Sequence, residues 1–190
     1  SAASDVYKRQ DEDHGSDNNS RTKIKKELEA VIKESWAFLT ANKKARRIMI
    51  VNSLIGAVST LVLFFLQAKL PLAGLNSALL GQALFFMGLG AAVGARVVAY
   101  FPNSRYRSIL TASGIGVLFA FGMTFTGKPG LMILGGFVGA FADDFLEVRT
   151  DVILNEMIPS KQRATLISVN SFLFSMVMIV LSTWMGWIMG

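Results

Sequence analysis

Four carboxylates stand close together in an otherwise apolar stretch: Asp143, Asp144, Glu147 and Asp151. On a helix, the first, third and fourth are four residues apart and drift by about 40° per step, so they form an acidic stripe. Charges are costly in lipid, so a stripe within a membrane must face a watery cavity, a cationic partner or protonated neighbours. Asp143 and Asp144 are therefore candidates for reversible proton binding, and with Glu147 for contact with a small cation.

The same region has a second interpretation, in which the charges form ion pairs. Glu147, Asp151 and Glu156 can lie at the cytoplasmic mouth of the helix and close a gate there by pairing with arginines. The basic candidates are Arg96, Arg105, Arg107 and Arg163. The simpler alternative for Arg105 and Arg107 is an ordinary positive loop on the cytoplasmic side.

Uncharged polar residues inside apolar runs form a further set of candidates for a solute pathway. They are Asn52, Gln67, Gln82 and Asn170, with Ser171 beside the last. More often such residues hold helices together by hydrogen bonds. Pairs of glycines four residues apart, at 90 and 94, 135 and 139, and 186 and 190, predict close helix packing instead.

Several chemistries find no support in the residues. The chain has no Cys and one His, His14, in a polar segment, so no metal site and no cofactor are expected. Phosphate-binding loops, nucleophile elbows and His-Glu-x-x-His pairs are absent from the sequence. The adjacent Asp143 and Asp144 leave an intramembrane carboxylate enzyme as a minor alternative.

The elements that carry these residues are long apolar segments. The composition is 52% hydrophobic and 17% charged, and the mean hydropathy is +0.46, which is unusual for a soluble domain. About 20 helical residues cross a bilayer. We therefore predict an all-α polytopic membrane protein with about five transmembrane helices, near residues 48–68, 75–95, 108–127, 129–158 and 164–190. The fourth enters the membrane at Pro129, which places Asp143 about 20 Å below that boundary, past the midplane.

A polar head precedes the spans. Residues 1–10 have the character of a translated sequencing adapter, and residues 11–22 are predicted to be disordered. Residues 23–47 have apolar positions at helical spacing, including Leu28, Val31, Ile32, Trp36 and Leu39, and predict an amphipathic helix on the cytoplasmic membrane surface. Packing of this helix on another soluble segment is the alternative.

Loop charges predict the orientation. Nine Lys and Arg border the loops on one side of the predicted spans, and only Lys69 and Lys128 lie on the other. Positive loops stay in the cytoplasm, so the N-terminal segment should be cytoplasmic. The net charge of +6 is explained by these loops and needs no nucleic-acid partner. Because the last span ends unflanked at Gly190, a sixth helix is expected beyond it.

One segment resembles the major facilitator superfamily of transporters. Residues 155–168 (NEMIPSKQRATLIS) are similar to the link between helices ten and eleven, where N-x-x-I-P-S-x-x-R-A-T-x-x-S recurs. Two weaker matches precede it: residues 65–74 resemble the outer end of helix seven, and Gly88, Gly90 and Gly94 resemble helix eight. The gating motif usual after helix eight is not matched, because Val98 stands where its acid falls.

The resemblance implies that residues 43–190 correspond to helices seven to eleven of a twelve-helix fold. It implies a missing N-terminal half, a small-molecule substrate near the midplane and alternating access, with the bilayer as the surrounding partner. From the residues alone, a structural or assembly membrane subunit stays open as the alternative to transport.

Overall fold

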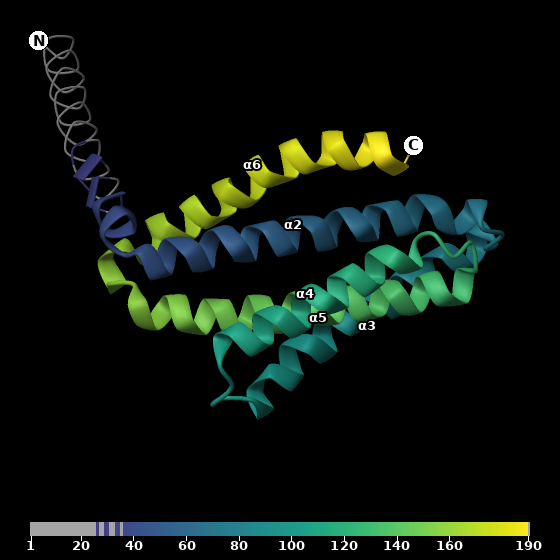
Figure 1. The fold of residues 1–190 in the computed structure, drawn as a ribbon, viewed down its shortest axis with the longest axis horizontal. Coiled ribbons are helices and arrows are strands. Elements are labelled where there is room, and N and C mark those ends of the chain that lie inside the picture. The colour runs from purple at the N-terminus through teal and green to yellow at the C-terminus, as the bar shows by residue number, and fades with distance from the viewer. Residues whose placement is uncertain (1–25, 27–28, 31–32, 35, 190) are drawn as a thin grey trace, which may run out of the picture.

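The computed structural model describes residues 26, 29–30, 33–34 and 36–189, and every regular element in these residues is a helix (Figure 1). The predicted all-α fold is therefore confirmed, while residues 1–22 lie outside the described part. The helices are α2 (Lys43–Leu72), α3 (Ser77–Val97), α4 (Tyr106–Met123), α5 (Pro129–Met157) and α6 (Arg163–Met189), with short 3-10 turns η1 (Val98–Tyr100) and η2 (Ser160–Gln162).

The helix ends lie within a few residues of the predicted spans, except at the start of α2. The predicted helix of residues 23–47 is broken at Asn42, whose side chain accepts a hydrogen bond from the Ala45 N–H at 3.1 Å and caps α2. The preceding residues 36–41 form a separate helical turn. Leu39 of this turn is buried against the bundle, whereas Trp36 is exposed. Leu28, Val31 and Ile32 are outside the described residues.

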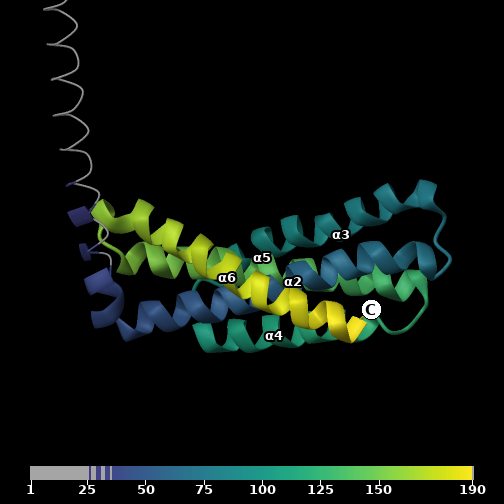
Figure 2. The same ribbon diagram turned by 90° about the horizontal axis from the view of Figure 1, so that it is seen from above.

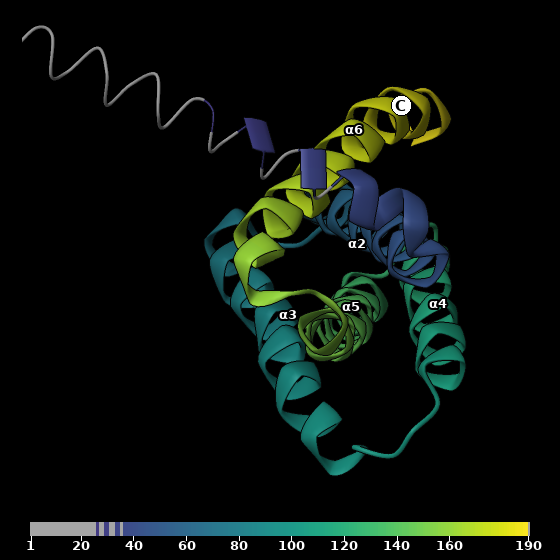
Figure 3. The same ribbon diagram turned by 90° about the vertical axis from the view of Figure 1, so that its left-hand side faces the viewer.

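Helix α5 occupies the middle of the bundle. It packs along α3 and α4, and α2 covers a third side, as the end-on view shows (Figure 3). Helices α3 and α4 flank the α2–α5 pair on opposite sides (Figure 2). Helix α6 packs mainly on α2 and diverges from it toward the C-terminal end (Figure 1). The charged residues of α5 therefore face whatever lies along the sides of α5 that α2, α3 and α4 do not cover.

Four of the helices are long and apolar enough to cross a membrane: 43–72, 77–100, 106–123 and 160–184. Large apolar side chains cover their outer surfaces, including Phe64, Phe85, Leu118, Phe172 and Ile179, each more than half exposed. Soluble monomers rarely expose apolar surface on this scale. These features indicate a membrane protein. Helix α5 is as long as α2 but is not among the four, and it carries the acidic stripe.

Close helix contacts explain two of the three predicted glycine pairs. A Cβ on Gly90 or Gly94 would collide with the backbone carbonyl oxygens of Phe137 and Phe141, so α3 and α5 touch backbone to backbone. Cβ atoms on Gly135 and Gly139 would instead collide with the side-chain Cβ atoms of Met123 and Ala120 on α4. Of the third pair, Gly190 lies outside the described residues, and nothing lies within 4 Å of a Cβ built on Gly186.

Apolar packing is concentrated at the two ends of the bundle. One cluster joins α2, α3, α4 and α5 around Leu66, Leu70, Met87 and Met132. The other joins α2, α5 and α6 at the opposite end, around Met49, Leu154 and Leu166. Between them, α2 carries a run of small and polar residues instead: Asn52, Ser53, Gly56, Ser59 and Thr60. The fold thus leaves a polar section in the middle of the bundle, between the two apolar clusters.

Candidate functional site

A polar cavity of about 320 Å³ lies in this middle section, between α2, α5 and α6. Four of the residues singled out from the sequence line it together: Asn52, Asp143, Glu147 and Asn170. Asp143 is the central residue of the 29-residue α5, about 21 Å from either end. The structure therefore brings predicted pathway residues from three helices to one place at half the depth of the bundle.

Gly56 forms the α2 side of the cavity. A Cβ at this position would lie 3.5 Å from Oδ1 of Asp143 and 3.6 Å from Cε2 of Phe174, which is ordinary van der Waals contact. The carboxylate and the aromatic ring thus both approach the α2 backbone. A larger side chain at residue 56 would fill the space that the carboxylate faces.

A hydrogen bond ties the two uncharged sides of the cavity together. The Ser53 hydroxyl donates to Oδ1 of Asn170 at 3.4 Å, linking α2 to α6. Ser59 donates to the Gly139 carbonyl at 3.4 Å and links α2 to α5. These bonds hold the walls in place while the carboxylates of Asp143 and Glu147 remain available to water or a solute.

A second polar cavity of about 190 Å³ continues toward the N-terminal end of α2. It shares Glu147, Asn170 and Ser171 with the first and adds Asp151 and Asn155. The predicted acidic stripe therefore faces polar cavities rather than the apolar surface. Together the two cavities, called the polar crevice below, lead from the middle of the bundle to the end that loop charges predict to be cytoplasmic.

Asp144 is placed differently from Asp143. Adjacent residues on a helix point about 100° apart, and Asp144 lines neither cavity of the polar crevice. Its side chain is half buried. In the described part of the chain, no group of three His, Cys, Asp or Glu side chains is placed to hold a metal ion.

The predicted gate residues are not paired in this structure. Arg163 donates to the Asn155 carbonyl at 3.0 Å, and Glu156 is exposed. Arg105 and Arg107 line a separate basic cavity, away from Glu147 and Asp151. No acidic and basic side chains of the described residues approach within 4.0 Å of each other. The gate expected from the sequence stays a prediction: Arg163 binds the Asn155 carbonyl beside the crevice, whereas Arg105 and Arg107 line a different cavity.

The remaining predicted pathway residues lie outside the crevice. Gln67 is exposed on α2, about 16 Å beyond Gly56 on the same helix face. Gln82 is exposed on α3. The structure adds lining residues that the sequence analysis did not select: Ser53, Gly56, Thr60, Phe174 and Ser175. Ser53, Gly56 and Thr60 of α2 could have been found from the sequence, because small and polar residues recur there at steps of three and four residues.

Arg149 is a further functional candidate that the sequence did not single out. Its Nη2 donates to the carbonyls of Pro102 at 2.8 Å and Ser104 at 3.3 Å, holding the loop between α3 and α4. The first residue of α4 is also fixed, since the hydroxyls of Tyr106 and Thr150 lie 3.2 Å apart. Helix α5 thereby positions the loop that carries Arg105.

Replacing Arg149 by Gln should loosen this loop without unfolding the bundle. Two charge-assisted hydrogen bonds would be lost, at a cost of about 1–2 kcal/mol for the half-buried side chain. Hydrogen exchange of residues 101–105 should become faster, while exchange in the middle of α2 stays unchanged. The matched control is Arg149→Lys, which retains the charge but not the fork of donors and should recover only part of the protection.

These observations define an all-helical protein with membrane-spanning character and a polar crevice at its centre. No family model matches the chain, and neither the curated proteins nor the solved structures contain a match. The function must therefore be argued from the crevice itself.

Proposed function

We propose that the chain is part of a secondary transporter that moves a small solute across a membrane by alternating access. The observation that carries the proposal is the central cavity, in which Asn52, Asp143, Glu147 and Asn170 converge between apolar clusters at either end. Carboxylates without a counter-charge are costly within a membrane and are typical there of ion and solute pathways. In this proposal α5 is a fifth membrane span, and the N-terminal segment is cytoplasmic.

The resemblance to the major facilitator superfamily fits this proposal. Within residues 155–168, Ile158 and Leu166 are buried in the apolar cluster, and Arg163 binds the Asn155 carbonyl. The segment is thus a tight corner between α5 and α6, which gives its isoleucine, arginine and asparagine physical roles. A corner of this kind lets two helices that line a cavity move as one unit.

Asp143 is the proposed binding group for a proton or a cation. It lies beside Gly56 and Phe174 in the larger cavity of the crevice. Glu147 and Asp151 then line the route between this group and the cytoplasmic side. The missing half of a two-half transporter would provide the opposite wall, so the solute itself is defined only as small and compatible with an acidic site.

Cysteine labelling tests the crevice without knowledge of the solute. The chain contains no Cys, so single replacements have no background within it. Ser171→Cys and Ser175→Cys should react with a membrane-impermeant maleimide added from the cytoplasmic side, because both residues line the crevice. Cysteines at Ile179 or Phe172, which are exposed on the outer surface of α6, should face lipid and react at least about tenfold more slowly.

Replacements at Gly56 provide two further tests in the labelling experiment. Adding Gly56→Leu should protect Ser175→Cys by filling the cavity, whereas Gly56→Ala should not, because a single Cβ fits there. Equal labelling of all four cysteines would contradict a water-filled crevice and favour an assembly subunit, whose charges are covered by a partner. In that case, deleting the gene would remove a complex rather than a flux.

A further inference from the structure

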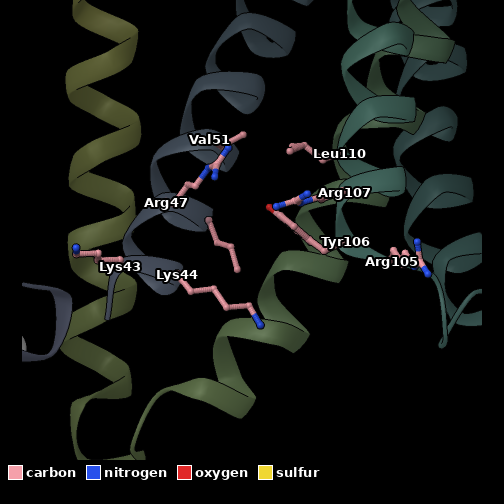
Figure 4. A pocket seen from close by; sticks show the side chains of 9 residues that line it. Lys43, Lys44, Arg47, Val51, Arg105, Tyr106, Arg107 and Leu110 are labelled. Carbon is pink, nitrogen blue, oxygen red and sulfur yellow. The ribbon is translucent and has the colours of Figure 1, made fainter. Parts of the chain in front are cut away.

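A second large cavity, of about 740 Å³, opens between the N-terminal ends of α2 and α4. Five of the nine residues that line it are Lys or Arg, and none is acidic. Arg47 and Arg107 point toward each other across the gap, and Lys44 points into it from the same helix as Arg47 (Figure 4). Lys43 and Arg105 point away from its centre (Figure 4). The cavity therefore has a cationic centre formed by three side chains from two helices.

The positive charge of this cavity is not neutralised within the described residues. None of its cations lies within 4.0 Å of a carboxylate of those residues, and the acidic stripe of α5 lines other cavities. Helix α4 begins at Tyr106, and no side chain caps its first N–H groups. The start of a helix carries a partial positive charge, which adds to that of the arginines. The arrangement is suited to a phosphate group.

Apolar side chains continue the cavity along the helices. Ile48 and Val51 follow Arg47 on α2, and Leu110 lies one turn after Arg107 on α4. On both helices, the lining side chains are thus cationic near the helix end and apolar further inward. A phospholipid has the same order, with a phosphate at the surface and acyl chains below it. A soluble phosphate would use only the first layer.

We propose that this cavity binds the headgroup of an anionic phospholipid in the membrane leaflet at this end of the bundle. Arg47, Arg107 and Lys44 hold the phosphate, the Tyr106 hydroxyl lies beside them, and Ile48, Val51 and Leu110 contact the start of an acyl chain. Basic pockets between membrane helices are known to take such headgroups. The proposal requires that the helices span a membrane, but it is independent of transport.

Native mass spectrometry of the purified protein in neutral detergent tests the proposal. The protein is titrated with dioctanoyl phosphatidic acid, dioctanoyl phosphatidylcholine or inorganic phosphate. Phosphatidic acid should bind at least tenfold more tightly than phosphatidylcholine. Inorganic phosphate at the same concentration should not displace it, because it lacks the apolar contacts.

Paired charge variants identify the site. Arg47→Gln with Arg107→Gln should weaken phosphatidic acid binding about tenfold, and Arg47→Lys with Arg107→Lys should retain most of it. Lys43→Gln with Arg105→Gln removes the same net charge from the periphery and should change binding less than threefold. All four side chains are exposed, so these variants should fold. Equal losses in the two Gln pairs, or displacement by inorganic phosphate, would overturn the lipid site.

Discussion

Replacing Gly90 and Gly94 together by alanine is expected to separate α3 from α5 and to destabilise the whole bundle. The added Cβ atoms would collide with the carbonyl oxygens of Phe137 and Phe141, which are backbone atoms and cannot rotate away. Overpacking of this kind costs about 1–3 kcal/mol per site, occasionally more. The double variant should therefore melt roughly 10 °C lower in detergent, or fail to elute as a single species in size-exclusion chromatography.

The chain offers a matched control for this experiment on the same helix. Nothing lies within 4 Å of a Cβ built on Gly81 or Gly88, so the double variant Gly81→Ala with Gly88→Ala adds the same two methyl groups in open space. Alanine also has the higher helix propensity, so this variant should be unchanged or slightly more stable. Equal melting temperatures for the two double variants would show that the α3–α5 contact is not as close as described.

Replacing Asp143 by asparagine is expected to stabilise the protein and to impair its function. The amide keeps the shape of the side chain but removes a charge that lies one turn from Glu147 and has no cation within 4.0 Å among the described residues. Relief of this repulsion should raise the melting temperature by about 2–4 °C at neutral pH. The difference from the original protein should shrink in acid, because protonation removes the same charge.

The effect of this replacement on the proposed transport is measured with the full-length protein in proteoliposomes. Proton-driven uptake of a solute that the original protein transports should fall to background in the Asp143→Asn variant if this carboxyl carries the proton. Glu156→Gln, whose exposed side chain lines neither cavity of the crevice, is the control and should retain most uptake and show little change in stability. Uptake that stayed pH-dependent in a protein with both Asp143 and Asp144 replaced by Asn would exclude the proton-carrier role.

Local properties of the sequence determined the helices. Runs of about 20 apolar residues predicted α2, α3, α4 and α6 to within about five residues, because length and hydropathy are properties of a segment alone. The start of α2 was missed, since the apolar periodicity of residues 23–47 hid the capping role of Asn42. The distance of about 20 Å between Asp143 and the start of its helix at Pro129 was also predicted, because it depends only on one helix, whereas the depth of Asp143 in a membrane stays a prediction.

Only the tertiary structure decided which polar residues meet. Asn52 and Asn170 join Asp143 in one cavity, whereas Gln67 and Gln82, equally polar and also within apolar runs, do not. Gln67 lies about 16 Å beyond Gly56 on the same face of α2, and Gln82 is on α3, which does not line the crevice. Which side chains of a lining helix enter the crevice depends on the rotation of that helix about its axis. That rotation is fixed by contacts between segments far apart in the sequence, such as the close contact of Gly90 with the Phe137 backbone. The sequence of a single segment does not encode such contacts. The same rotation turns the acidic stripe of α5 into the crevice and leaves the arginines of the α4 end around a different cavity.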